Sequence, residues 1–252
     1  MNLLLHGLNY PNIDNGNSLR TPLRDIGDDQ RVNIILSNPP FGGEEEKGIL
    51  SNFDSDKRTA ETAMLFMQLI MRKLKRKTLT SSGGRAAVVI PNGTLFADGI
   101  AARIKEQMMK DFCLHTIVRL PDGVFAPYTD IPCNILFFDH DKPAKNVWFY
   151  ELPPPAGRKK YSKTASIQYE EFEEVKAWWK NRTENENAWQ VATKDILRYD
   201  AEGKLLSANL DRKNPNRKSE NVYIEPSVAI TNIVEKEHQI MALMNEIQAL
   251  IV

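Results

Sequence analysis

The chain has 252 residues, of which 42% are hydrophobic and 26% charged, so it can bury the core of one large domain or of one domain with an appendage. Lysine and arginine together equal aspartate and glutamate at 33 each, so an anionic partner has to be met by a local basic patch. No apolar stretch is long enough to span a bilayer, and no cysteine or histidine spacing fits a zinc site. Cys113 and Cys133 lie in apolar segments, which predicts reduced thiols in a cytoplasmic protein and excludes a disulfide scaffold.

Short strand patterns alternate with helical patterns in the N-terminal half of the chain. Residues 32–37 (VNIILS) are apolar at successive positions, which is typical of a central parallel strand that is buried on both faces. Further patterns predict a helix over 59–77, a strand over 85–91, a helix over 98–111, and strands over 113–120 and 133–139. This alternation predicts an α/β fold with a mostly parallel sheet, in which the last two strands, with no helix between them, are antiparallel.

The composition becomes more polar after the run of prolines at 153–155. We interpret residues 153–226 as a linker and tail region with one helix, over 170–181. That helix is rich in glutamate and carries Trp178 and Trp179. We expect the two indoles to anchor the helix to the main domain, because an amphipathic helix buries its large apolar side chains.

The C-terminal segment, 227–252, reads SVAITNIVEKEHQIMALMNEIQALIV. Its apolar residues recur close to every three and a half positions, which predicts a helix with a coiled-coil-like stripe. We expect this helix to pack on a helix of another subunit. The alternative is that the stripe docks on the core of this chain.

The stretch at the end of the first predicted strand, Asn38-Pro39-Pro40-Phe41, is the most informative in the sequence. The plain interpretation is a turn, but ligands of parallel sheets bind at this end of the strands. The two prolines hold Asn38 and Pro39 in one extended shape before a substrate arrives. The Asn38 side-chain oxygen and the Pro39 carbonyl can then accept hydrogen bonds from one amino group, while Phe41 offers a face on which its ring stacks. The pattern favours a site for a planar molecule that carries an amino group.

Seven stretches of the chain are typical of one protein family. They are MNLLLHGL (1–8), NSL (17–19), LSNPPFGG (36–43), AAVVIPNGTLF (86–96), TIVRLPDGVFAPYTDIPCNILFFD (116–139), VWFYEL (147–152) and NLDRKNPNR (209–217). They resemble the modification subunit of type I restriction–modification systems, a branch of the adenine-N6 DNA methyltransferases. Asn-Pro-Pro-aromatic alone is shared with methyltransferases of protein glutamine and of RNA, so 116–139 and 209–217 indicate the type I branch.

The resemblance implies a Rossmann-like methyltransferase fold for residues 1–152, which correspond to the C-terminal part of the catalytic domain, and a helical C-terminal arm for assembly at 227–252. It implies methyl transfer from S-adenosylmethionine to the N6 amine of an adenine flipped out of the duplex. The implied partners are double-stranded DNA, a DNA specificity subunit and, in the full complex, a restriction subunit.

The resemblance also assigns roles to individual residues. The catalytic motif corresponds to Asn38, Pro39, Pro40 and Phe41. The flipped adenine would be faced by Phe41, Tyr128 and Thr129. The cofactor would be contacted by Asn17, Ser18, Leu19 and Asn38. The family usually has an aspartate where this chain has Asn17, and an asparagine oxygen can still accept a hydrogen bond from the cofactor's adenine amine.

Family members hold S-adenosylmethionine with a glycine-rich loop that follows a first strand, and no stretch of this sequence fits that pattern. The chain therefore resembles the C-terminal half of a methylase, and we expect a separate N-terminal half as a partner and no appreciable activity of the isolated chain. Two alternatives stay open. One is a catalytically silent DNA-binding or assembly fragment, and the other is a methyltransferase that acts on amines of RNA or protein.

Two basic segments, RKLKRK (72–77) and GRKKYSK (157–163), are candidates for phosphate contacts. The first is explained adequately as the solvated end of a helix, because cations are favourable at a helix C-terminus. The second follows the proline run, and a flexible basic loop near DNA is as plausible for it as a plain linker.

Overall fold

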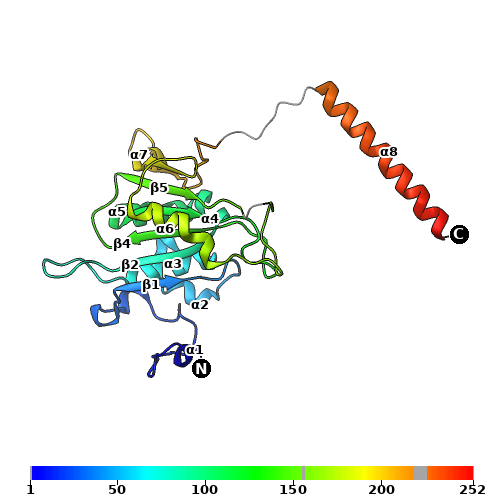
Figure 1. Cartoon of the computed structure of the whole chain (residues 1–252). Helices are drawn as coiled ribbons and strands as arrows, with labels where there is room; N and C mark the ends of the chain where they lie inside the picture. Colours follow the sequence, from blue (N-terminus) through cyan, green and yellow to red (C-terminus); the bar gives the residue numbers. More distant parts are fainter. Residues whose placement is uncertain (1, 155–156, 218–225, 252) are drawn as a thin grey trace. The chain divides into compact units, whose positions relative to one another are not determined.

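The computed structural model describes residues 2–154, 157–217 and 226–251. The chain divides into two compact units, Met1–Asn216 and Arg217–Val252. The first unit is built around a mixed sheet (Figure 1). Its strands are β1 Ile34–Ser37, β2 Arg85–Pro91, β3 Cys113–Arg119, β4 Cys133–Asp139, β5 Asn146–Glu151 and β6 Ala188–Ala192.

The strand order in this sheet is β1-β2-β4-β3-β5-β6. The pairs β1–β2 and β3–β5 are parallel, whereas β4 is antiparallel to both β2 and β3, and β6 is antiparallel to β5. The α/β prediction and the antiparallel pairing of β3 with β4 are therefore confirmed. Because β1, β2, β3 and β5 run in the same direction, their carboxyl ends and the loops that follow them share one edge of the sheet.

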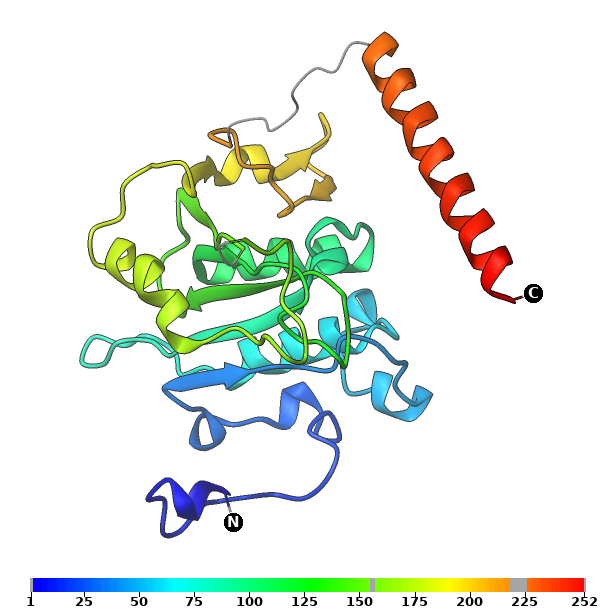
Figure 2. The same ribbon diagram turned by 45° about the vertical axis from the view of Figure 1, so that its right-hand side comes forward.

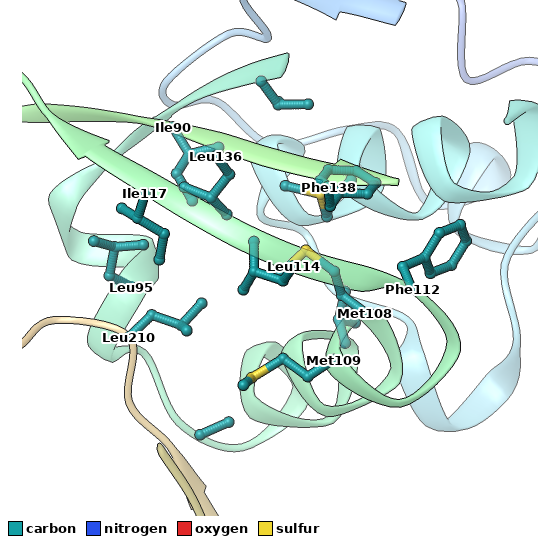
Figure 3. Packing of buried hydrophobic residues seen from close by; sticks show 14 of the residues in the cluster. Ile90, Leu95, Met108, Met109, Phe112, Leu114, Ile117, Leu136, Phe138 and Leu210 are labelled. Atoms are coloured by element: carbon teal, nitrogen blue, oxygen red, sulfur yellow. The ribbon is translucent and has the colours of Figure 1, made fainter. Parts of the chain in front are cut away.

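Two amphipathic helices, α3 Thr62–Lys73 and α5 Ile100–Asp111, cover one face of the sheet. Their buried methionines and isoleucines meet alternate residues of the strands in the main core. Figure 3 shows Met108 and Met109 of α5 beneath Leu114 and Leu136 of the strands. Helix α3 ends earlier than predicted, because the chain beyond Lys73 becomes extended and its backbone exchanges hydrogen bonds with Val32 instead.

The remaining elements of the first unit are short. The helices are α1 Asn2–Leu5, α2 Lys47–Leu50, α4 Asn92–Phe96, α6 Glu173–Lys180 and α7 Thr193–Ile196. Strands β7 Leu197–Tyr199 and β8 Leu205–Ala208 form a separate antiparallel pair. Leu210, just after this pair, is buried, and its amide donates to the Leu95 carbonyl at 2.9 Å. Through this contact the polar region that follows residue 153 packs on the main core (Figure 3).

Helix α6 covers part of the opposite face of the sheet. Trp178 is 6% exposed, its ring contacts Trp148 and Tyr150 of β5, and its indole N–H donates to the Thr183 carbonyl at 2.9 Å. Trp179 lies edge-on to Phe137 of β4. The predicted role of the two tryptophans as anchors is confirmed.

The expectation that residues 32–37 form a central strand buried on both faces is wrong for this chain. β1 lies at the edge of the sheet, and among the described strands it pairs with β2 alone. Ile35 packs against the main core, but Ile34 and Leu36 point to the other face and are 55% and 80% exposed. Helix α6 does not reach across to them, because it packs over β4, β3 and β5.

The second unit contains helix α8, Pro226–Ile251, which confirms the predicted C-terminal helix. The side chains of its apolar stripe that the structure describes are exposed, among them Ile233, Ile240 and Met244 at 55–58%. No described helix is long and apolar enough to cross a membrane.

Candidate functional site

The Asn-Pro-Pro-Phe motif follows β1 directly and lies at the edge of the sheet where the parallel strands end. Pro39 is buried, which fixes the start of the turn, whereas Asn38 is exposed. Among the residues that the structure describes, none makes a hydrogen bond to the Asn38 side chain. The amide is thus held on a rigid backbone with its oxygen open to an incoming donor.

Phe41 meets a second aromatic ring that sequence reasoning missed. Its centroid lies 5.3 Å from that of Phe125, with an edge-to-face angle of 79°, a favourable arrangement for two rings. Phe125 belongs to the loop of residues 120–132, which leaves the carboxyl end of β3. The signal that could have found it is an aromatic residue in the same loop as Tyr128, although a sequence does not show that this loop reaches Phe41.

Tyr128 and Thr129 both lie in this loop, but they differ in exposure and in hydrogen bonding. Tyr128 is 92% exposed, so its ring is free to contact a substrate. The Thr129 hydroxyl accepts a hydrogen bond from the Ile131 amide at 3.1 Å, and both the Tyr128 and the Thr129 amides donate to the Phe125 carbonyl. The hydrogen bonds of Thr129 therefore also shape the loop that carries Phe125 and Tyr128.

The predicted cofactor segment, residues 17–19, lies beside the loop that follows the motif. Asn17 donates from Nδ2 to a Glu45 carboxylate oxygen at 3.1 Å, and its Oδ1 accepts from the Leu19 amide at 2.9 Å. Ser18 is exposed, whereas Leu19 is fully buried in a small core with Leu65. Asn17 and Ser18 are thus available to a ligand, and the Leu19 side chain serves as their anchor.

Two threonine hydroxyls hold the loop behind the motif. Thr62, at the start of α3, donates to the Gly43 carbonyl at 2.9 Å. Thr94, in α4, donates to the Glu61 carboxylate at 3.1 Å. Because Gly43 has φ +105°, a conformation that L side chains rarely adopt, this turn needs glycine. The loop after β1 is thereby tied to the segment after β2.

A buried lysine of α5 holds the segment after β2 through hydrogen bonds to its backbone. Lys105 of α5 is 2% exposed, and its Nζ donates to the carbonyls of Thr94, Leu95 and Ala97 at 2.7–3.1 Å. Thr94 and Leu95 lie in the last turn of α4 and Ala97 directly follows it, where carbonyls lack partners within the helix. Burial lowers the pKa of Lys105 to about 8, and the carboxylates of Asp98 and Glu61 oppose that shift.

The loop of residues 120–132, the candidate substrate loop, is fastened at its end as well. The Asn92 amide donates to the Pro132 carbonyl at 2.8 Å, and the Asn92 side-chain oxygen accepts from Asn134 of β4 at 3.2 Å. Cys133 is buried, and burial raises the pKa of its thiol to about 11. The thiol therefore stays protonated near neutral pH and is no nucleophile.

No described group of three or more histidine, cysteine, aspartate or glutamate side chains could hold a metal ion. His115 instead bonds the Thr116 hydroxyl and lies edge-on to Trp179. Both cysteines are free. The arrangement at the edge of the sheet consists of an open amide, two aromatic rings and an exposed tyrosine, which can hold and orient a planar amine.

Comparison with known proteins decides the family. The model of the N-6 DNA methylase family matches residues 1–208. The chain belongs to the N-6 DNA methylase family. This membership confirms the resemblance on which the assignment of the Asn-Pro-Pro-Phe motif rests, although the roles of the individual residues stay predictions.

The relatives of this N-6 DNA methylase chain include type I enzymes. The EcoEI methylase subunit of the type I restriction enzyme of Escherichia coli is 44% identical over 98% of this chain and 49% of its own length. The crystal structure of a modification subunit from Vibrio vulnificus YJ016 is 63% identical, with a TM-score of 0.83 over 85% of this chain and 45% of that one. A structure of a type I R-M system is 35% identical, with a TM-score of 0.76 over 99% and 51%. The chain therefore spans about half the length of these relatives.

Proposed function

We propose that this chain is the acceptor half of an adenine-specific DNA methyltransferase, within the modification subunit of a type I restriction–modification system. The observation that carries the proposal is the exposed Asn38 amide at the carboxyl end of β1, beside the edge-to-face pair of Phe41 and Phe125. Family membership supports this class of reaction. This chain spans about half of its relatives' length, and we propose that the reaction also needs the rest of a methylase.

The chemistry needs two acceptors directed at one nitrogen. The lone pair of an adenine amine is delocalised into the ring, and hydrogen bonds from the amine to the Asn38 oxygen and the Pro39 carbonyl favour a pyramidal, more nucleophilic nitrogen. Stacking on an aromatic ring is worth about 1–3 kcal/mol per base, and Phe41 supplies that ring. Since the amine is inaccessible in a paired duplex, the base has to be flipped out.

S-adenosylmethionine would supply the electrophilic methyl group. The described residues fit this cofactor in part. Asn17 and Ser18 are exposed next to the loop that follows the motif, and the Asn17 oxygen keeps a lone pair for the amine of the cofactor's adenine. We propose that the rest of the cofactor is held by the other half of the methylase.

The other half of the methylase would also complete the sheet. β1 exposes Ile34 and Leu36 on one face and, among the described strands, pairs along one edge only. Next to them is a cavity of about 360 Å³, which Phe137 and Trp179 also line. Exposed apolar side chains on an unpaired edge strand are a template for another strand. We propose that the other half adds a strand to β1 and covers this face.

For helix α8 we propose a contact with a long helix of the DNA specificity subunit. Its apolar stripe, which is exposed within a unit of its own, supports a partner rather than the core of this chain. The type I R-M complex among the similar structures supports assembly with other subunits. In the full complex a restriction subunit would join them.

The function is tested by Asn38→Ala in an enzyme reconstituted with the remaining methylase half and the specificity subunit. We expect methyl transfer to fall about 10²-fold or more, as for the loss of one group that stabilises a reacting atom, while DNA binding stays nearly unchanged. Asn33→Ala is the matched control, because Asn33 is an exposed asparagine just before β1, away from the motif. Near-normal transfer by Asn38→Ala would refute the amine-acceptor role. No transfer by the wild-type complex would instead support an assembly fragment.

A further inference from the structure

The basic segment GRKKYSK (157–163) lies beside the loop that carries Phe125 and Tyr128. It belongs to the connection that follows the carboxyl end of β5, at the same edge of the sheet as the motif. The Tyr161 amide donates to the Asp122 carbonyl at 2.9 Å, and Lys160 Nζ lies 4.0 Å from an Asp130 carboxylate oxygen. Figure 2 shows the two loops, green and yellow-green, running together beyond the ends of the strands.

This segment is anchored rather than a free linker. Tyr161 is 1% exposed, and its hydroxyl donates to Glu171 at 2.8 Å. Gly123 of the neighbouring loop has φ +76°, and a Cβ there would lie 2.3 Å from the Tyr161 carbonyl oxygen. Only glycine allows the two backbones to approach so closely. The position of the segment is thereby set by the substrate loop.

The charges of the segment point to solvent. Arg158, Lys159, Lys160 and Lys163 are all exposed. The ion pair of Lys160 with Asp130 is long, and both side chains are more than half exposed, so it neutralises little charge. Arg158 also interacts electrostatically with Glu171. Residues 157–163 nevertheless contain four cations and no acidic residue, so the segment places positive charge next to the candidate substrate loop.

We propose that residues 157–163 bind the sugar-phosphate backbone of DNA close to the flipped base. This inference rests on the proposed function, because the segment would grip the strand whose base enters the site beside Phe41 and Phe125. Backbone contacts of this kind position the duplex and contribute affinity without reading sequence. Buried Tyr161 would transmit that position to the substrate loop through its bond to the Asp122 carbonyl.

The other basic segment, 72–77, serves as a matched control. The Lys75 amide donates to the Val32 carbonyl, just before β1, so this segment lies at the opposite end of that strand from the motif. Lys77 pairs with Asp141 through two contacts of 2.7 Å. These cations therefore lie at the far end of β1 from the motif.

The test compares two charge-matched variants of the full chain. One is Arg158→Gln/Lys159→Gln/Lys160→Gln, and the other is Lys75→Gln/Arg76→Gln/Lys77→Gln. Each loses three positive charges. Binding to a fluorescent duplex oligonucleotide is measured by anisotropy across a salt series. Each phosphate contact contributes about 0.9 to the slope of log K against log salt, so we expect the slope of the first variant to fall by about two to three and that of the second to stay at the wild-type value.

The outcomes separate this proposal from the function. Equal changes of slope in both variants, or no duplex binding by the wild-type chain at low salt, would overturn it. Loss of slope in the first variant alone would support it even if the reconstituted wild-type enzyme transferred no methyl group, in which case the proposed function would fail and the DNA-binding segment would stand. Circular dichroism spectra that match the wild type would show that both variants are folded.

Discussion

The buried Lys105 should make the free energy of unfolding of this chain rise with pH in the alkaline range. Its ammonium group is 2% exposed and is surrounded by the carbonyls of Thr94, Leu95 and Ala97. Burial lowers its pKa from 10.5 to about 8. The unfolded chain therefore binds a proton at Lys105 more tightly than the folded chain does.

The sign follows from proton linkage. Where the unfolded state binds more protons, the free energy of unfolding increases as pH rises. For Lys105 this window extends from about pH 8 to 10.5. One pH unit inside it corresponds to about 1.36 kcal/mol. Between about pH 7 and about pH 10 the Lys105 contribution should thus stabilise the folded chain by about 2.5 kcal/mol.

The assay compares urea unfolding of the wild type and of Lys105→Met across this range. Other lysines and the tyrosines titrate in both proteins, so the difference between their free energies of unfolding isolates Lys105. We expect that difference to shift by about 2.5 kcal/mol in favour of the wild type from about pH 7 to about pH 10. The control Lys180→Met removes an exposed lysine of α6 and should run parallel to the wild type. A Lys105→Met curve parallel to the wild type would refute the reasoning.

Two further predictions concern surfaces assigned to partners. Deletion of residues 227–252 should leave the cooperative melting of the remaining chain unchanged and abolish co-purification with the specificity subunit, because α8 belongs to a separate unit; loss of the melting transition would place the helix in the core. Leu36→Ser, at a side chain 80% exposed, should change the free energy of unfolding by no more than about 0.5 kcal/mol but weaken association with the other methylase half. The control for Leu36→Ser is a substitution in the core: Ile90→Ala, at a side chain 1% exposed, should lower the free energy of unfolding by about 2–5 kcal/mol.

Strands β1 to β4 of the main sheet could be predicted because their hydrophobic patterns are local, whereas β5 and β6 were not predicted. The predicted helix over 98–111 and the strand over 85–91 correspond to α5 and β2. The end of α3 could not be predicted, since its sequence stays helical in character beyond Lys73. A backbone exchange with Val32 stops it there, and that partner is remote in the sequence.

The candidate site divides in the same way. Asn38 and Phe41 could be proposed from the sequence because prolines impose a rigid shape that a sequence reveals. Phe125 was missed because its role depends on an approach to Phe41 from a loop behind another strand. The burial of Lys105 against three carbonyls was missed as well, since a lysine in an amphipathic helix is ordinarily solvated.

The error at β1 has a different origin. The VNIILS pattern correctly describes a strand that is apolar on both faces, yet the chain leaves Ile34 and Leu36 exposed. A sequence is selected in the assembly in which it works, so its pattern reports burial in that assembly. Where a pattern typical of burial meets exposed side chains, we interpret the discrepancy as a surface for a partner. This exposure supports the proposal that β1 is a docking edge, because an isolated domain gains nothing from leucine at a position exposed to water.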